Sequence, residues 1–236
     1  MNQLFKHSPI NDRQIETVLN RLHKEADRQT GSLILHYLPQ LPRLFLGKGI
    51  QWDRTKTDFY RDKYIPIEPD QGEFMYLLAR SLNAKTIVEY GTSFGISTIY
   101  LAAAVRDNGG SLVIGTEIVP EKVAQARKNI AEAGLENYVE IREGDALETL
   151  KTLDRPIDMV LIDGWANLAL DILKLLNPLI RIGGIVVSDN VNTFKEALKP
   201  YVDFLQNSQN GYCSSTINLK GGTEFSVKID NTSIPN

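Results

Sequence analysis

Three side chains in two short motifs could bind a metal ion. "LIDG" places Asp163 at the end of one β-branched run, and "VVSDN" places Asp189 and Asn190 at the end of another. Two carboxylates and an amide supply the oxygen ligands that Mg²⁺ or Ca²⁺ prefers, with water completing the shell. The alternative is that Asp163 only lines a cofactor pocket, while Asp189 and Asn190 form a polar turn.

A glycine turn could bind the polar end of a ligand. In "VEYGTSFGIST" (residues 88–98), Gly91 and Gly95 let the backbone approach a ligand closely, and the helix that follows offers free N–H groups to a carboxylate. A dinucleotide fold requires GxGxxG around a pyrophosphate, and here Ser93 occupies the place of the middle glycine. The turn therefore disfavours a nicotinamide cofactor.

Two further acids stand where strands are expected to end. Glu117 lies 22 residues beyond Gly95 and could accept hydrogen bonds from two ribose hydroxyls. Asp145, beside Ala146, could accept a hydrogen bond from the exocyclic amine of an adenine. The alternatives are an exposed strand end for Glu117 and a helix N-cap for Asp145, and the N-cap role is compatible with adenine binding.

The elements that position these residues alternate in type. Short β-branched runs predict strands at residues 86–89, 112–117, 139–142, 159–163 and 185–188. Helical periodicity predicts helices at residues 73–82, 96–105, 121–133, 146–150, 168–178 and 193–207. Strands that alternate with helices predict a parallel sheet with helices on both faces, because parallel strands need crossover connections. In such a sheet a ligand binds beyond the carboxyl ends of the strands, near the point where strand order reverses.

The end of the chain has a different pattern. "GYCSSTINLKGGTEFSVKI" reads as two alternating strands about a Gly221-Gly222 turn, which predicts an antiparallel hairpin. The predicted fold class is therefore α/β: a Rossmann-like, doubly wound, mostly parallel sheet of seven strands, with a C-terminal antiparallel hairpin and an N-terminal helical layer.

The first 70 residues form that layer. Asn11 and Asp12 can cap a helix whose apolar side chains share one face, namely Ile15, Val18, Leu19 and Leu22. An apolar piece at residues 33–46 is cut into short lengths by Pro39 and Pro42. We expect most of its large side chains, such as Leu33 and Leu38, to complete the core. Residues 52–64 are a candidate substrate wall. The predicted organisation is a layer at 1–70, which is not an independent domain, followed by a ligand-binding domain at 71–236.

Composition limits the class of protein and its partners. The chain has 236 residues, of which 42% are hydrophobic and 23% charged, which predicts a globular protein. The net charge of −3 provides no broad basic face for nucleic acid. No stretch approaches the ~20 apolar residues of a membrane span, and no signal peptide is recognised. The single cysteine, Cys213, excludes an internal disulfide. We expect a cytoplasmic protein that binds neither nucleic acid nor membrane.

The region from about residue 69 to 229 resembles a known family. "PDQGEFMYLLARSLNAKTIVEYGTSFGISTIYLA", "EIVPEKVAQARKNIAEAGL", "IDMVLIDG" and "GGIVVSDNV" agree, in order and spacing, with the motifs of class I S-adenosylmethionine-dependent methyltransferases. Within that class they resemble the metal-dependent catechol and caffeoyl-CoA O-methyltransferase group. About two thirds of the chain is covered, and the last motif is the most specific.

The resemblance implies a role for each matching residue. Glu89, Gly91 and Ser97 would hold the amino-acid end of S-adenosylmethionine. Glu117 would bind its ribose, and Asp145 with Ala146 its adenine. Asp163, Asp189 and Asn190 would bind Mg²⁺ or a similar ion and assist catalysis. The remaining cofactor contacts would be Ser93, Gly95, Ile118, Asp163 and Trp165. The resemblance also implies a homodimer.

One position departs from the family pattern. The group usually has a lysine three residues after the first metal aspartate, taken as the base or charge partner of the acceptor hydroxyl, and this chain has Ala166 there. Trp165 agrees with the catechol branch. A bound divalent ion lowers the pKa of a coordinated hydroxyl, so transfer without the lysine remains chemically feasible. Other candidate bases are Lys48, Lys56, Lys63, Lys195 and the histidines His7, His23 and His36, for which a surface or structural role is the alternative.

The leading hypothesis is an S-adenosylmethionine-dependent O-methyltransferase. It would transfer a methyl group to a hydroxyl of a small, catechol-like acceptor that is chelated to the divalent ion. Three alternatives remain: a metal-independent small-molecule methyltransferase, a non-catalytic protein that binds S-adenosylmethionine, and a nicotinamide oxidoreductase, which Ser93 disfavours.

Overall fold

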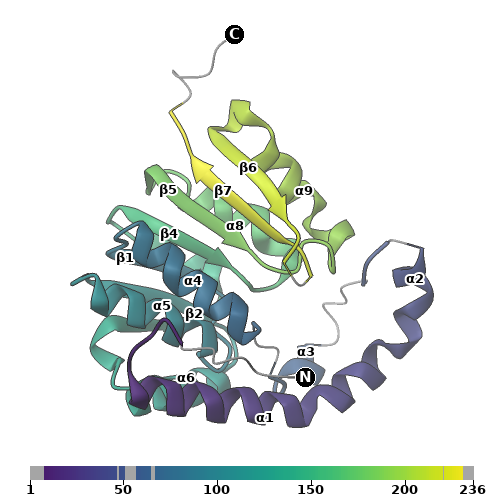
Figure 1. Ribbon diagram of the computed structural model, residues 1–236. Helices are drawn as coiled ribbons and strands as arrows, with labels where there is room; N and C mark the ends of the chain where they lie inside the picture. Colours follow the sequence, from purple (N-terminus) through teal and green to yellow (C-terminus); the bar gives the residue numbers. More distant parts are fainter. Residues whose placement is uncertain (1–7, 47, 51–56, 65–66, 220, 231–236) are drawn as a thin grey trace.

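A seven-stranded sheet forms the centre of the molecule (Figure 1). The computed structural model describes residues 8–46, 48–50, 57–64, 67–219 and 221–230. The strands are β1 (Thr86–Tyr90), β2 (Leu112–Glu117), β3 (Val139–Glu143), β4 (Ile157–Ile162), β5 (Ile180–Ser188), β6 (Tyr212–Ile217) and β7 (Thr223–Lys228). Their order is β3-β2-β1-β4-β5-β7-β6; the first five are parallel, and β7 pairs antiparallel with both β5 and β6. The predicted fold class and the hairpin are confirmed.

Helices connect the strands and precede them. They are α1 (Arg13–Tyr37), α2 (Leu41–Phe45), α3 (Thr57–Tyr60), α4 (Pro69–Ser81), α5 (Ile96–Asp107), α6 (Pro120–Glu132), α7 (Ala146–Thr149), α8 (Ala169–Leu176) and α9 (Lys195–Gln206). Short 3₁₀ turns follow α1 and α7 and precede α8. Strand order reverses between β1 and β4, and this is where the carboxyl ends of an open α/β sheet leave room for a ligand.

Each face of the sheet has its own core, because successive strand residues point to opposite faces. In β1, Ile87 packs with α1, α4, α5 and α6, whereas Val88 packs with α7, α8 and α9. In β5, Val187 joins the first core and Val186 the second. Both faces are therefore covered, as the near-continuous apolar runs of these strands require.

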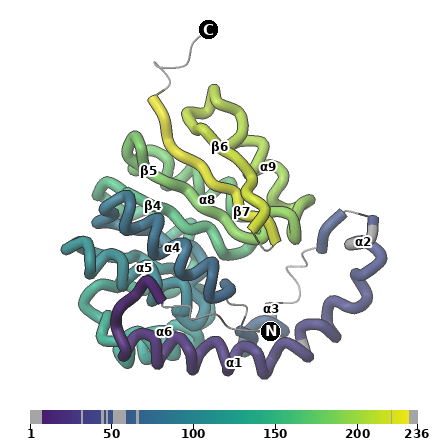
Figure 2. The backbone as a smooth tube through the Cα atoms, in the orientation of Figure 1, coloured from purple at the N-terminus to yellow at the C-terminus, as the bar shows by residue number. Residues whose placement is uncertain are grey.

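The N-terminal layer spans the molecule from α6 to α9. Asp12 caps α1 by accepting hydrogen bonds from the backbone N–H groups of Gln14 and Ile15. The predicted face of Ile15, Val18, Leu19 and Leu22 is buried. Arg21 then pairs with Glu132 of α6 at 2.7 Å, and Arg43 of α2 pairs with Glu196 of α9 at 2.6 Å. Figure 2 shows α1 passing alongside α6 and continuing to α2.

Several predicted boundaries and one burial prediction were wrong. Helix α4 begins at Pro69 rather than at residue 73, because Pro69 stands at the first helical position behind a capping box of Glu68 and Gln71. Strand β4 ends at Ile162, one residue before Asp163, and β5 begins at Ile180, before its two glycines.

Leu38 is 50% exposed, because it follows α1 where the helix has left the core. Trp52 lies outside the described residues. None of the described helices combines the length and apolar character of a membrane span.

Two glycines allow the ends of β1 and β4 to touch. A Cβ at Gly91, whose φ is +100°, would lie 2.5 Å from the carbonyl oxygen of Asp163. A Cβ at Gly164 would lie 2.5 Å from the ring of Tyr90. The Asp163 N–H donates to the Tyr90 carbonyl at 2.9 Å and extends the strand pairing past the end of β4. A side chain at Gly91 would therefore force apart the two connections that leave the switch point.

We expect Gly91→Ala to lower the free energy of unfolding by roughly 3 kcal/mol or more, because it combines a positive φ with a backbone clash. Gly109→Ala is the control: its φ is +60°, but nothing lies within 4 Å of the added Cβ. That variant should lose about 1 kcal/mol from backbone strain alone. Urea unfolding measures both changes, and equal losses would contradict the proposed contact.

Candidate active site

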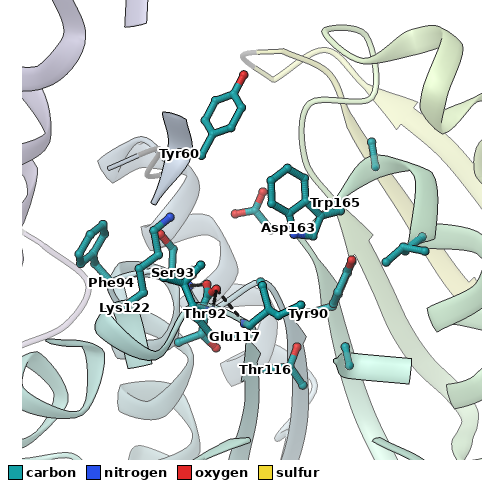
Figure 3. A pocket seen from close by; sticks show the side chains of 18 of the residues that line it. Tyr60, Tyr90, Thr92, Ser93, Phe94, Thr116, Glu117, Lys122, Asp163 and Trp165 are labelled. Atoms are coloured by element: carbon teal, nitrogen blue, oxygen red, sulfur yellow. Dashed lines mark hydrogen bonds between the residues drawn. The ribbon is translucent and has the colours of Figure 1, made fainter. Parts of the chain in front are cut away.

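A pocket lies at the switch point, beyond the carboxyl ends of the parallel strands (Figure 3). The strand register explains which side chains meet there. Tyr90 of β1 is level with Thr116 of β2 and with Ile162 of β4, and Ile162 is level with Ser188 of β5. The next residues along these four strands are Glu117, Gly91, Asp163 and Asp189, so one row across the sheet carries three carboxylates.

Most of the predicted site residues line this pocket. They are Gly91, Ser93, Ser97, Glu117, Ile118, Asp145, Ala146, Asp163, Trp165, Ala166 and Asn190. Three predicted site residues are not among those that line the pocket: Glu89, Gly95 and Asp189. Gly95 precedes α5 with a φ of +85°, so its place is the turn into the helix. The other two are buried carboxylates.

Glu89 is hydrogen-bonded to the glycine turn and to the helix that follows it. Its side chain is completely buried, and Oε2 accepts hydrogen bonds from the hydroxyls of Thr92 and Thr98. Oε1 is buried and has no hydrogen-bond partner among the described residues. Burial raises the pKa of this carboxyl above its ordinary value. Oε2 of Glu89 is therefore already hydrogen-bonded, whereas Oε1 could accept a hydrogen bond from a ligand.

Glu117 also organises the turn. Its Oε2 accepts from the backbone N–H of Ser93 at 2.9 Å, and its Oε1 accepts from the N–H groups of Ile118 and Val119. Ser93 has a φ of +49°, which turns its N–H toward the carboxylate. Each oxygen of a carboxylate has a second lone pair, so Glu117 can still accept from ligand hydroxyls.

One wall of the pocket consists of residues that the sequence patterns did not indicate. Lys122, on the first turn of α6, is buried and lines the pocket with its Nζ 5.3 Å from the centre of the Phe94 ring. Tyr64 stacks on Phe94, with ring centres 3.9 Å apart. Burial lowers the pKa of Lys122. A lysine in a helical sequence usually reads as a surface residue, so no sequence signal marked Lys122.

Asp145 serves as the N-cap of α7, where its side chain accepts from the backbone N–H of Leu147. The N-cap role is the alternative that the sequence analysis gave for Asp145. Asp145 also lines the pocket together with Ala146, so capping and ligand contact are both open to it.

The surroundings of Asp163 and Asp189, the two aspartates of the predicted metal site, disfavour their charged forms. Burial raises the pKa of Asp163 well above its ordinary value, and the charges of Asp189 and Glu89 raise it further. Burial likewise raises the pKa of Asp189 to about 6. The neighbouring charges with the largest effect are negative: those of Asp189 and Glu89 on Asp163, and that of Glu68 on Asp189. A proton or a bound cation would relieve this repulsion.

Hydrogen bonds fix Asp189 from three sides. Gln71 of α4 donates to Oδ1 at 2.8 Å, Thr223 of β7 donates to the same oxygen at 3.4 Å, and Asn190 donates to Oδ2 at 3.0 Å. Asn190 therefore presents its amide nitrogen, not its oxygen, to Asp189. Rotation of that amide by half a turn would give a cation the oxygens of Asp163, Asp189 and Asn190.

The donor set thus suits a hard cation by its chemistry. It holds only two carboxylates, and the described residues contain no group of three or more His, Cys, Asp or Glu side chains placed to hold a metal ion. The amide of Asn190 and water would have to complete the shell.

The far end of the pocket is aromatic. Trp165 lies above Asp163, and its ring is 6.2 Å from that of Tyr60 in an edge-to-face arrangement (Figure 3). Ala166, at the position of the family's lysine, is buried and presents only a methyl group. Tyr60 belongs to α3, so the N-terminal layer contributes directly to the pocket.

Part of the chain is similar to known proteins. Residues 88–191 match the family model described as a methyltransferase domain. A catechol O-methyltransferase of Niastella koreensis is 39% identical over 131 residues, which are 54% of this chain and 58% of that protein. A caffeoyl-CoA O-methyltransferase of Pinus taeda is 32% identical over 127 residues, 51% of this chain and 48% of that protein. The chain spans about half to three fifths of the length of these curated relatives.

The fold has close counterparts among solved structures. An O-methyltransferase from Bacillus cereus in complex with SAH has a TM-score of 0.65 at 24% identity, and the match covers 76% of this chain and 92% of that one. The resemblance to the catechol and caffeoyl-CoA O-methyltransferases is confirmed by the family model and by these homologues.

The raised pKa of Asp163 has a consequence for stability. The folded protein binds a proton at Asp163 more tightly than the unfolded chain does, so the free energy of unfolding falls as pH rises from the unfolded pKa through the folded one. Asp163→Asn removes this loss. We expect the variant to be more stable than the unmodified protein at pH 8, by about 1 to 3 kcal/mol, and the two to converge near pH 4.

Urea unfolding in EDTA between pH 4 and pH 8 tests this. Asp171→Asn, at an exposed position of α8, is the control and should follow the unmodified protein at every pH. Parallel curves for Asp163→Asn and the unmodified protein would show that Asp163 is not destabilised by its surroundings.

Proposed function

We propose that the protein is an S-adenosylmethionine-dependent O-methyltransferase that acts on a small, catechol-like acceptor. The observation that carries the proposal is one pocket lined both by Glu117, at the end of β2, and by Asp163, Trp165 and Asn190, which follow β4 and β5 on the other side of β1. The Glu117 side suits the ribose of the cofactor, and the other side suits an acceptor with adjacent oxygens. The names of the matched relatives support the same reaction.

The cofactor would lie along the carboxyl ends of β1, β2 and β3. Glu117 would accept hydrogen bonds from the ribose hydroxyls, and Asp145 from the adenine amine. Ser97 and the unpartnered Oε1 of Glu89 stand where the amino-acid end would enter the glycine turn. Methyl transfer from a sulfonium to an oxygen requires alignment of sulfur, carbon and oxygen and exclusion of water, which an enclosed pocket provides.

A divalent cation, Mg²⁺ or Ca²⁺, is the second part of the proposal. Asp163, Asp189 and Asn190 would hold it, and the raised pKa values of the two aspartates favour this because a cation would stabilise their charged forms. When bound, it would chelate adjacent acceptor oxygens and stabilise the anionic one.

Metal-independent methyl transfer is the second candidate. Asn190 donates its amide nitrogen to Asp189, and Ala166 replaces the usual lysine. Both features are compatible with a site in which one of the two aspartates is protonated and no metal ion is bound.

Calorimetric titration of Mg²⁺ and Ca²⁺ into the metal-stripped complex with S-adenosylhomocysteine separates the two candidates. We expect saturable binding by the unmodified protein and at least a tenfold loss of affinity in Asp189→Ala, because one charged ligand is removed. Asp171→Asn serves as the control and should bind the ion normally. Absence of binding by the unmodified protein would contradict the metal-assisted mechanism.

Methyl transfer to catechol, with and without EDTA, then tests the reaction itself. Transfer that EDTA abolishes supports the metal-assisted enzyme, and transfer that EDTA leaves unchanged supports the second candidate. If S-adenosylhomocysteine binds but no methyl group is transferred to catechol or to monohydroxylated phenols, the proposed O-methyltransferase function is contradicted.

We further propose that residues 1–70 act as a lid on the domain at 71–236 and that two copies form a homodimer. The support is a strip of exposed apolar side chains where the layer leaves the body of the molecule: Ile34, Leu35, Leu38, Leu41 and Leu46. A second copy would cover this strip, since exposed apolar patches mark interaction sites. The proposed setting is the cytoplasm, and the proposed ligands are small molecules and not a membrane. The net charge of −3 supports the proposal that nucleic acid is not a partner.

Light scattering during size-exclusion chromatography measures the proposed dimer. We expect a mass of two chains for the unmodified protein and a dissociation constant at least tenfold higher for Leu35→Glu, which places a charge in the strip. Leu77→Glu is the matched control, because Leu77 is exposed on α4, away from the strip. A monomer at every concentration would contradict the dimer.

A further inference from the structure

We propose that Lys122 is a second ribose-binding residue: its amine donates a hydrogen bond to a ribose hydroxyl of the cofactor whose own proton is accepted by Glu117. The inference rests on the proposed function and adds a residue that determines which cofactor the same site selects. It starts from the position of Lys122, which is only 7% exposed, lines the pocket and lies on α6, five residues after Glu117.

The amine of Lys122 has no hydrogen-bonding partner in the part of the chain that the structure describes. Nζ lies 5.3 Å from the centre of the Phe94 ring, and it makes neither a hydrogen bond nor an ion pair with the described residues. The charges of Glu117 and Asp62 favour its charged form, whereas burial has the larger effect and lowers its pKa. Because a buried amine without an acceptor is costly, a ligand oxygen beside it would be stabilising.

Glu117 already uses the backbone donors around it. The N–H of Ser93 donates to its Oε2, and the N–H groups of Ile118 and Val119 donate to its Oε1. A ribose hydroxyl is both a donor and an acceptor. When its proton goes to Glu117, its oxygen still needs a donor, and these three N–H groups are engaged. The amine of Lys122 supplies that donor.

Lys122 lies on the side of the pocket that this contact requires. Figure 3 shows its side chain next to Phe94 and Ser93, on the side where Glu117 lies and away from Trp165. Phe94 directly follows Ser93, whose N–H is bound by Glu117, so Lys122 and Glu117 meet the same part of the glycine turn. Both side chains therefore border the place that the proposed function gives to the ribose.

Aromatic contacts restrict where the amine can lie. A cation over an aromatic face is attracted to the ring, and the ring below Lys122 is itself held by Tyr64, which stacks on Phe94 with planes 12° apart. Tyr64 is anchored to α1: its hydroxyl donates to Glu25 at 3.0 Å, and its N–H donates to the side chain of Gln29 at 2.9 Å. A donor held in this way loses little conformational freedom when a ligand binds.

The lysines that were candidate bases are placed differently. Lys63 is hydrogen-bonded to Asp62 at 2.8 Å, and Lys48 and Lys195 are exposed. Lys56, like His7, lies outside the described residues. Among the lysines of the described ranges, Lys122 alone lines the pocket.

The contact would make the site selective for a ribose over a deoxyribose. Glu117 alone recognises the proton of a hydroxyl, whereas Glu117 with Lys122 recognises both its proton and its oxygen. An analogue of the cofactor that lacks the hydroxyl would leave both side chains without that partner, and a buried polar group left unpaired is costly. We therefore expect the unmodified protein to bind S-adenosylhomocysteine more tightly than its 2′-deoxy or 3′-deoxy analogue by at least tenfold.

Calorimetric titration of the full chain with these three ligands tests the inference in Lys122→Met, which keeps an apolar stem and removes the amine. We expect S-adenosylhomocysteine to bind about tenfold more weakly, as for loss of one hydrogen bond to a charged group. The deoxy analogue that lacks the contacted hydroxyl should lose less than twofold, so the preference for S-adenosylhomocysteine over that analogue should fall about tenfold. Partial unfolding of the variant would lower both affinities by the same factor and leave this preference unchanged.

A fourth ligand separates the ribose from the amino-acid end of the cofactor. 5′-Methylthioadenosine has the same ribose and no carboxylate, so Lys122→Met should weaken its binding by the same factor of about ten. A loss confined to S-adenosylhomocysteine would assign the amine to the carboxylate and overturn the ribose contact. Lys128→Met is the matched control, because Lys128 lies exposed on the same helix, and it should bind all four ligands as the unmodified protein does.

The outcomes separate this inference from the proposed function. If the unmodified protein binds S-adenosylhomocysteine and methylates catechol, but Lys122→Met keeps the same preference for S-adenosylhomocysteine over both deoxy analogues, the inference is overturned and the proposed function stands. If the unmodified protein does not bind S-adenosylhomocysteine, the proposed function is contradicted and the inference with it.

Discussion

The close approach of β1 and β4 is the constraint on which the site depends. At the switch point one connection turns toward α5 and the other toward α8, and both begin where a Cβ on Gly91 or Gly164 would collide with the other. Because neither glycine has a side chain, β1 and β4 can stay paired in register up to their last residues. That register brings Glu117, Asp163 and Asp189 into one row, although 72 residues of chain separate the first from the last. The site is thus a property of strand pairing more than of any single loop.

The same register concentrates negative charge in a poorly solvated place. Burial raises the pKa values of Glu89, Asp163 and Asp189, and the charges of Asp189 and Glu89 raise that of Asp163 further. A fold selected only for stability would place apolar groups here, since unpaired buried charge is costly. Two of these carboxyls are nonetheless held in place: Glu89 by threonine hydroxyls, and Asp189 by Gln71 and Thr223. Polar groups held in an unfavourable field are typical of sites that bind a positively charged ligand, and a sulfonium cofactor and a divalent cation are both positively charged.

The sequence predicted the sheet and its acidic row because both follow from short-range patterns. β-branched runs that end in Glu117 or Asp163 are local signals, and parallel pairing then brings those ends together. Contacts between distant segments were not predictable in this way. Lys122 lies over the Phe94 ring, and Phe94 stacks with Tyr64, which comes from another part of the chain. The start of α4 at Pro69 was missed because the capping box of Glu68 and Gln71 lies before the apolar periodicity that predicted a helix at residues 73–82. Leu38 was predicted to be buried from its residue type alone, whereas its exposure depends on where α1 leaves the core.

The N-terminal layer is part of the pocket and not an appendage to it. It is paired with the rest of the chain by Arg21 with Glu132 and by Arg43 with Glu196. Its helix α3 places Tyr60 edge to face against Trp165, which follows the end of β4, and both residues line the pocket. The wall of the pocket beside Asp163 therefore depends on two segments that lie more than 100 residues apart in the chain, which is why no local pattern could have predicted it.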